Sequence, residues 1–138
     1  MKETNTIKYS KGYKYMLEEE AYIYTGIILK DDFITKRVIH FKNGWLLIKD
    51  GFGWDGASGI AYDDHTNMRA SLMHDGMYYL LRHGFPMKYR IISDEMLKQL
   101  MITDGAIPIR AKYYKWAVSH FGKGSADPQN QRKIIKAP

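Results

Sequence analysis

Two side chains in this sequence could together activate a water molecule, the imidazole of His74 and the carboxylate of Asp94. The spacing of apolar residues predicts one helix over 67–81 and a second over 87–102, and each side chain lies on the apolar stripe of its helix. Both side chains lie about ten residues from the turn near Gly84. Because residues equidistant from the turn of an antiparallel helix pair are neighbours, we expect His74 to contact Asp94.

Such a contact has a chemical consequence for the imidazole. A carboxylate that binds one ring nitrogen leaves the other nitrogen free to act as a general base. Tyr78 follows His74 by one helical turn and can reach the same carboxylate. His74, Asp94 and Tyr78 are therefore candidate catalytic residues. A histidine on an apolar face can equally be a hydrogen-bonded member of the core, and the sequence leaves both interpretations open.

Asp75 follows His74 directly and points about 100° away around the helix, toward a glycine-rich segment over 50–59 if that segment packs alongside. A carboxylate combined with backbone carbonyls is a calcium-type oxygen site. The candidate metal ligands are Asp75, Gly51, Gly53 and Gly56. The alternative is that the glycines only turn the chain from sheet to helix. Asp63-Asp64-His65 could also bind a metal, but helix capping by Asp64 or Thr66 explains this stretch better.

The elements that must position these residues indicate an α+β fold. Alternating β-forming residues predict an antiparallel meander over about 7–50, with a hairpin turn at Asn43-Gly44. After the helices over 67–81 and 87–102, a third helix is expected over 108–121, with Pro108 in its first turn. We expect one domain over 1–122 and a mobile basic tail over 123–138.

The third helix is interpreted as structural. Its aromatic residues Tyr113, Trp116 and Phe121 have the spacing of a core-facing stripe, and Arg110 suits a buried ion pair.

Length and composition limit the class of protein. The 138 residues are 45% hydrophobic and 26% charged, typical of one globular domain. The absence of cysteine excludes disulfides, Cys zinc sites, thiol nucleophiles and iron–sulfur clusters. No apolar run approaches the ~20 residues of a membrane span, and the N-terminus lacks a signal-peptide hydrophobic region.

The charge is unevenly distributed between the two halves of the chain. Residues 1–66 carry net −1 and residues 67–138 net +7. A basic half favours an anionic partner, either nucleic acid or an anionic lipid surface, although a solvated basic surface without a partner is the alternative. Nucleic acid is the weaker candidate because no helix-turn-helix, zinc or RNA-recognition signature is present.

The ordered set of motifs resembles the phage and prophage family known as domain of unknown function 1353. The residues that carry this resemblance lie between about 38 and 122 and are Gly51-Phe52-Gly53-Trp54-Asp55-Gly56-Ala57-Ser58, His74-Asp75-Gly76-Met77-Tyr78, Ser93-Asp94, and Arg110 to Gly122. The chain differs from the usual family pattern at Gly59, Met77 and Ser93, none of which replaces a candidate polar group.

A more distant resemblance is to cysteine-free phospholipase A2-like proteins, and it covers about residues 51–103. Those proteins combine a glycine-rich calcium loop, an HD-x-x-Y helix and an antiparallel helix with an Asp. The resemblance implies that His74 is a general base oriented by Asp94 and supported by Tyr78. It also implies that Asp75 and the loop containing Gly51, Gly53 and Gly56 bind calcium.

Two functions of different classes follow. The first is a non-enzymatic phage or prophage component, in the virion or in contact with a host protein, whose His–Asp pair only joins two helices. The second is a calcium-dependent phospholipase A2-like hydrolase of lipid esters, with an anionic membrane surface as partner. Either would be found in the host cytoplasm or in the virion.

Overall fold

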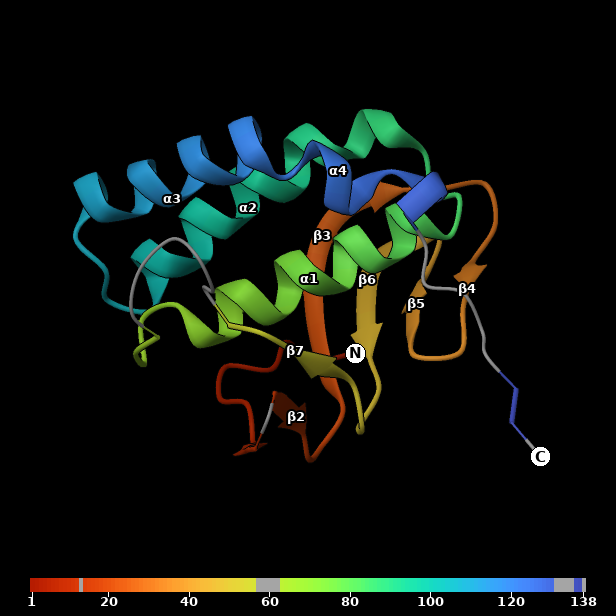
Figure 1. Cartoon of the computed structure of the whole chain (residues 1–138), viewed down its shortest axis with the longest axis horizontal. Helices are drawn as coiled ribbons and strands as arrows, with labels where there is room; N and C mark the ends of the chain where they lie inside the picture. The colour runs from red at the N-terminus through yellow and green to blue at the C-terminus, as the bar shows by residue number, and fades with distance from the viewer. Residues whose placement is uncertain (13, 57–62, 131–135, 138) are drawn as a thin grey trace.

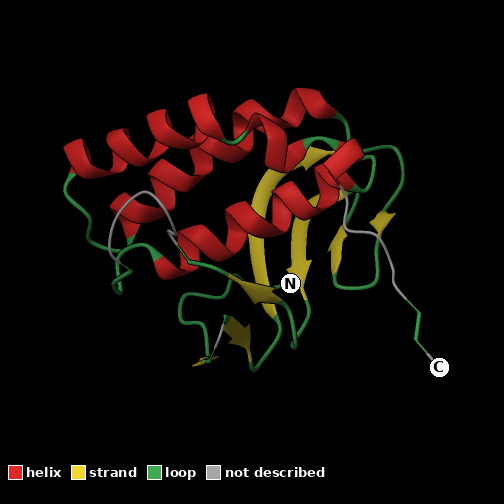
Figure 2. Ribbon diagram, viewed as in Figure 1, coloured by secondary structure: helices red, strands yellow, loops and turns green. Residues whose placement is uncertain are grey.

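The computed structural model describes residues 1–12, 14–56, 63–130, 136 and 137 (Figure 1). The Ala57-Ser58 end of the glycine-rich motif, Gly59 and residues 131–135 of the expected tail lie outside the described residues. The fold is α+β, as predicted: short antiparallel strands come first and helices follow, and Figure 2 shows the helices gathered on one side of the strands.

The strands among the described residues form two small sheets. One has the order β1 (Tyr9–Lys11), β2 (Tyr15–Leu17) and β7 (Gly53–Trp54), and the other the order β3 (Ala21–Ile28), β6 (Asn43–Ile48), β5 (Val38–His40) and β4 (Phe33–Ile34). The single meander expected over 7–50 is therefore divided. The cause is that β2 pairs with β7, a strand inside the segment that was expected to be a loop.

The hairpin expected at Asn43-Gly44 is present between β5 and β6, but its turn is wider than predicted. Gly44 adopts a φ of 99°, whereas Asn43 does not have a positive φ and already pairs with Ile28 of β3. The N–H of Phe41 donates to the carbonyl of Trp45 at 2.7 Å and closes the hairpin, so the three residues from Lys42 to Gly44 form the turn in place of two.

In the described part of the chain, four helices follow the strands: α1 (Met68–Arg82), α2 (Arg90–Thr103), α3 (Pro108–Phe121) and α4 (Lys123–Ala126). The 3-10 turn Met87–Tyr89 precedes α2, and the 3-10 turn Pro128–Asn130 follows α4. In Figure 1, α1 crosses in front of β3 and β6, α2 returns antiparallel to it, and α3 lies along α2. The three long helices thus lie within three residues of their predicted ranges.

Helix α1 is the centre of the molecule, and 12 of its 15 residues are buried. One close approach depends on glycine: a Cβ at Gly76 would come within 2.7 Å of Ile48 Cδ1 on β6. Because α1 packs between a sheet and α2, even its polar side chains lie inside the protein and need partners.

Three expectations outside the site are wrong. The residue at the N-cap of α1 is Asn67, because Asp64 instead closes the preceding turn by accepting from the N–H and the hydroxyl of Thr66. The segment after α3 is not wholly a mobile tail: α4 packs on α1, with Ala126 fully buried. The aromatic side chains of α3 expected in the core are exposed, and they are Tyr113, Trp116 and Phe121.

Among the described residues, no helix is long and apolar enough to cross a membrane.

Candidate functional site

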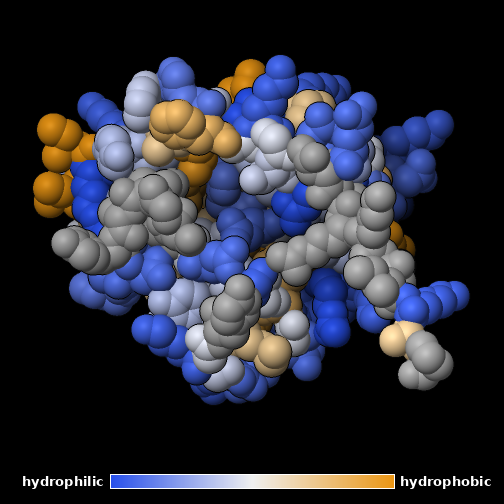
Figure 3. All heavy atoms as spheres, viewed as in Figure 1, coloured by the Kyte–Doolittle hydropathy of each residue, from blue (hydrophilic) through white to orange (hydrophobic). Residues whose placement is uncertain are grey.

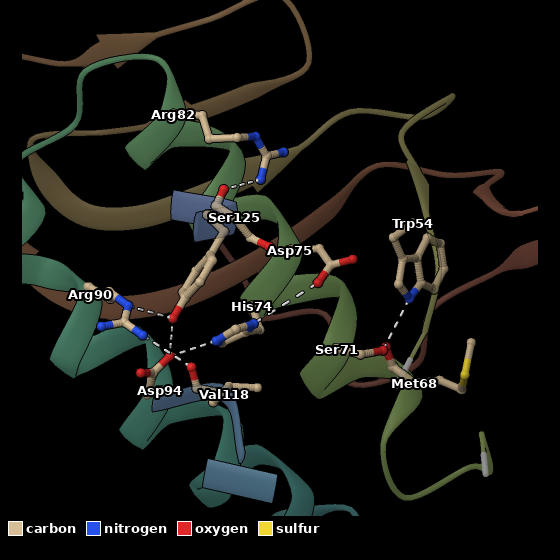
Figure 4. Close-up of polar contacts among 11 residues, drawn as sticks. Trp54, Met68, Ser71, His74, Asp75, Arg82, Arg90, Asp94, Val118 and Ser125 are labelled. Carbon is tan, nitrogen blue, oxygen red and sulfur yellow. Dashed lines mark hydrogen bonds and ion pairs between the residues drawn. The ribbon is translucent and has the colours of Figure 1, made fainter. Parts of the chain in front are cut away.

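The predicted contact between α1 and α2 is present. Nε2 of His74 lies 2.7 Å from Oδ1 of Asp94, and the two side chains point toward one another in Figure 4. Both residues are buried, His74 being 6% exposed and Asp94 2%. At this depth neither side chain can depend on water for hydrogen bonds, so each fixes the position of the other.

Asp94 accepts hydrogen bonds from two further side chains. The hydroxyl of Tyr78 donates to Oδ1 at 2.7 Å, and the hydroxyl of Ser119 on α3 donates to Oδ2 at 3.0 Å. Burial alone would raise the pKa of Asp94, but the hydrogen bonds from His74, Tyr78 and Ser119 outweigh it and hold this pKa below its ordinary value. Asp94 is therefore ionised at neutral pH.

The ionised carboxylate determines the tautomer of His74. A carboxylate without a proton can only accept, so Nε2 of a neutral imidazole must carry the hydrogen. The lone pair is then on Nδ1, at the opposite side of the ring. Nδ1 lies 4.0 Å from Oδ1 of Asp75, too far for a direct hydrogen bond. Nδ1 of His74 is thus a basic nitrogen, and the buried carboxylate of Asp94 fixes the orientation of its ring by accepting from Nε2.

Arg90, the first residue of α2, contacts the His74–Asp94 pair indirectly, through Tyr78 and the end of α3. Its Nε donates to the Tyr78 hydroxyl at 3.0 Å, and its Nη2 donates to the carbonyls of Val118 and Ser119 at 3.1 and 2.9 Å. These bonds connect the end of α3 to the hydroxyl that contacts Asp94. Burial, with the neighbouring Asp94, raises the pKa of Tyr78, so its hydroxyl remains a donor.

The sequence reasoning missed Arg90 and Ser119 as members of this site. Arg90 precedes Asp94 by four residues and so lies on the same face of α2, a signal that was available. Ser119 had no such signal, because its contact depends on how α3 is rotated against α2.

Asp75 does point to the glycine-rich segment, as predicted. Trp54 at the end of β7 anchors that segment, since its ring N–H donates to the Ser71 hydroxyl of α1 at 3.1 Å. The next residue, Asp55, donates its backbone N–H to the Asp75 carboxyl group. Surrounding protein atoms raise the pKa of Asp75 to about 6 although its side chain is 36% exposed, and the nearby Asp55 carboxylate adds to the rise.

The three glycines proposed as metal ligands lie against three different neighbours. A Cβ at Gly51 would be 2.9 Å from the guanidinium of Arg37, at Gly53 3.6 Å from the carbonyl of Tyr15, and at Gly56 2.5 Å from the carboxylate of Asp63. Gly51, Gly53 and Gly56 thus lie against a guanidinium, a backbone carbonyl and a carboxylate from three separate parts of the fold.

The residues present do not fit calcium in this arrangement. The loop offers Asp75 an N–H donor where a calcium site needs carbonyl oxygens, and a guanidinium lies against Gly51. Within the described ranges, no group of three or more His, Asp or Glu side chains could hold a metal ion. We therefore assign no chemical step to calcium at Asp75, Gly51, Gly53 and Gly56.

The other candidate ligands have structural roles. Arg110 forms an ion pair with Asp64 at 2.8 Å and donates to the Thr66 hydroxyl at 2.7 Å, which joins the start of α3 to the turn before α1. Asp63 accepts from the Tyr15 hydroxyl at 2.7 Å. The ion pair expected for Arg110 is therefore present, away from His74, but it is partly exposed and not buried, since the Asp64 side chain is 40% exposed.

Two of the shallow hollows among the described residues lie away from His74. One is lined by β1, β2 and Gly53, and the other by residues 5–9 together with His65, Met68, Arg69 and Asp104. In the second hollow the carboxylate of Asp104 already has a partner, because Arg69 binds it through two nitrogens at 2.8 and 3.0 Å.

Comparison with protein-family models, with curated proteins and with solved structures found no match to this chain. The two resemblances described from the sequence therefore remain predictions.

Proposed function

We propose that this chain is a hydrolase of lipid esters in which His74 is the general base. The observation that carries the proposal is the buried hydrogen bond between Nε2 of His74 and the ionised Asp94, which leaves the lone pair on Nδ1. The resemblance to phospholipase A2-like proteins supplies the substrate class. The resemblance to the phage and prophage family supports a role in the virion or in the infected host.

The proposed reaction needs one proton carrier and one water molecule. Nδ1 takes a proton from water as the oxygen attacks the ester carbonyl carbon, which gives a tetrahedral intermediate. The imidazolium then returns the proton to the leaving alkoxide as the bond between the carbonyl carbon and the alkoxide oxygen breaks, which yields a fatty acid and an alcohol. Asp94 stabilises the imidazolium, while Tyr78 and Ser119 keep the carboxylate in place.

The test is release of fatty acid from phosphatidylglycerol vesicles, measured by pH-stat titration with calcium and with a chelator. Wild-type protein should release fatty acid, His74→Ala should abolish release, and Asp94→Asn should reduce it at least a hundredfold through loss of the oriented base. His83→Ala is the matched control, because His83 follows α1 but is exposed. Absence of release under both conditions would refute the hydrolase.

A second candidate is a non-enzymatic phage or prophage component. One observation favours it: His74 is 6% exposed and the described hollows lie elsewhere, as expected for a pair that only joins helices. In that case His74→Ala lowers the melting temperature and no activity exists to lose. The basic residues Arg132, Lys133 and Lys136 would contact the partner, so replacing all three with Ala should weaken capture of a phage or host protein. Unchanged capture would contradict this role.

A further inference from the structure

The exposed side of α3 carries a continuous row of large apolar residues. Ile109, Tyr113 and Trp116 lie four and three residues apart, which places them on one line along the helix. Ile109 is 74% exposed, Trp116 49%, and Phe121 at the end of the helix 77%. We call Ile109, Tyr113, Trp116 and Phe121 the α3 ridge. In Figure 3, orange and tan spheres mark apolar residues at the end of the molecule where Figure 1 places α3.

The α3 ridge is separate from the face by which α3 joins the core. The buried residues of the helix are Ala111, Tyr114, Ala117 and Val118. Helix α3 thus has two apolar sides, and folding of this chain uses only the buried one. A continuous exposed apolar row of this size is a typical sign of an interaction site.

The aromatic rings of the ridge are already arranged against one another. The rings of Tyr113 and Trp116 stack with centroids 6.2 Å apart, and the Phe121 ring meets Trp116 edge-on at 5.8 Å. His120 also lies on Trp116, at 4.6 Å. These contacts restrict the side chains before any partner binds, so little conformational entropy is lost on binding.

The charged residues that α3 itself contributes beside the ridge are all basic. The sequence of α3 contains Arg110, Lys112 and Lys115 and no Asp or Glu. Lys115 pairs with Glu95 of α2 and Arg110 with Asp64, which leaves Lys112 next to the apolar row as the basic group facing outward. A second copy of this ridge would bring like charges together, which disfavours self-association through it.

The shape of the ridge also limits the partner. The row lies along the outermost side of a helix, and the shallow hollows among the described residues lie on other parts of the protein. A convex row of Ile, Tyr, Trp and Phe can sink into a deformable surface but offers no groove to a peptide. Tyr and Trp beside Lys are the residues favoured at the boundary between headgroups and acyl chains.

We propose that the α3 ridge binds an anionic lipid surface, with its apolar side chains in the acyl boundary and Lys112 against the headgroups. The surface is distinct from His74, and its binding does not depend on the proposed hydrolase. Because Ser119 of the same helix donates to Asp94, a lipid-bound α3 would hold the His74–Asp94 pair at a fixed distance from the membrane.

The test is co-sedimentation with vesicles of phosphatidylcholine alone or mixed equally with phosphatidylglycerol. Wild-type protein should bind the mixed vesicles, and Trp116→Ser should weaken this binding at least tenfold. Lys112→Ala should weaken it about fivefold on mixed vesicles and leave binding to the neutral vesicles unchanged. Ile34→Ser on β4 is the matched control, since Ile34 is an apolar residue more exposed than Trp116 (69% against 49%) but lies far from α3 in the fold (Figure 1), and it should bind as wild type does.

Failure of wild-type protein to bind mixed vesicles overturns the proposal, as does equal binding by Trp116→Ser. A dimer in solution that Trp116→Ser dissociates, without vesicle binding, would assign the ridge to a second copy of the chain instead. His74→Ala should still bind vesicles. Vesicle binding without fatty-acid release therefore refutes the hydrolase alone, and release without binding refutes the lipid surface alone.

Discussion

Replacement of Asp94 by Asn tests whether the negative charge, and not merely the shape, holds the centre of the helical layer together. Asn keeps the size of the side chain and one acceptor oxygen. It weakens the bonds from His74 and Tyr78 and replaces the acceptor of the Ser119 hydroxyl by an NH2 group, and a hydrogen bond to a charged group is worth about 1 kcal/mol more than a neutral one. The three changes together reduce the unfolding free energy by about 3 kcal/mol, and removal of the buried charge offsets about 1 kcal/mol of this loss.

The net loss of about 2 kcal/mol should lower the melting temperature by about 7 °C in a domain of this size. The pKa of Asp94 is lower in the folded protein than in the unfolded chain, so its contribution is present above the ordinary Asp pKa and is lost as the pH falls below it. The deficit of Asp94→Asn should therefore be full at pH 7 and smaller at pH 3.

Thermal unfolding followed by circular dichroism at both pH values measures this deficit. Asp31→Asn is the control, because Asp31 is exposed between β3 and β4 and should melt as wild type does. An unchanged melting temperature for Asp94→Asn at pH 7, or the same deficit at pH 3 as at pH 7, would show that the charge does not stabilise the site.

Two further variants test the packing and the electrostatics around the pair. Gly122→Ala places a Cβ against the carbonyl of Val118 and 3.1 Å from the ring of Tyr78. The variant should therefore lose about 2 kcal/mol of unfolding free energy in denaturant titrations. A loss below about 0.5 kcal/mol would contradict this packing. Asp75→Asn should stabilise the protein at pH 8 but not at pH 3.5, because the pKa of Asp75 is raised to about 6 and the stability contributed by its protonated form is lost as the pH rises through that value. The raised pKa of Asp75 corresponds to about 3 kcal/mol, and the partial exposure of its side chain reduces the expected stabilisation to about 1 kcal/mol, or about 3 °C in melting temperature. A lower melting temperature of Asp75→Asn than of wild type at pH 8 would refute this reasoning.

The centre of the site could be predicted from the sequence because it depends on local rules. Helix periodicity placed His74 and Asp94 on inward faces, and the short turn at Gly84 fixed the register of α1 against α2. A buried imidazole and a buried carboxylate at matching positions then had to meet. The same reasoning extended to Tyr78, which lies one turn from His74 and donates to Asp94.

The loop near Asp75 shows where such rules stop. The glycine content of residues 50–59 indicated unusual backbone angles, and Gly51 and Gly56 do have positive φ. Composition does not determine whether a loop turns its carbonyls or its N–H groups toward a neighbour. Pairing of β7 with β2 sets the direction of the backbone, and it presents the N–H of Asp55 to Asp75.

Helix α3 shows a different limit. Apolar spacing identified a face with Tyr113 and Trp116 and assigned it to the core, whereas the buried face is built from the smaller Ala111, Ala117 and Val118 together with Tyr114. Small side chains let α3 approach α2 closely enough for Ser119 to reach Asp94 and for Arg90 to reach the carbonyl of Val118. The need for close packing at the His74–Asp94 pair therefore places the small face inward, and the large aromatic residues must lie outside. Packing against α2 therefore accounts for the small buried face, while the exposure of Trp116 and Ile109 is the observation from which the proposed lipid surface is argued.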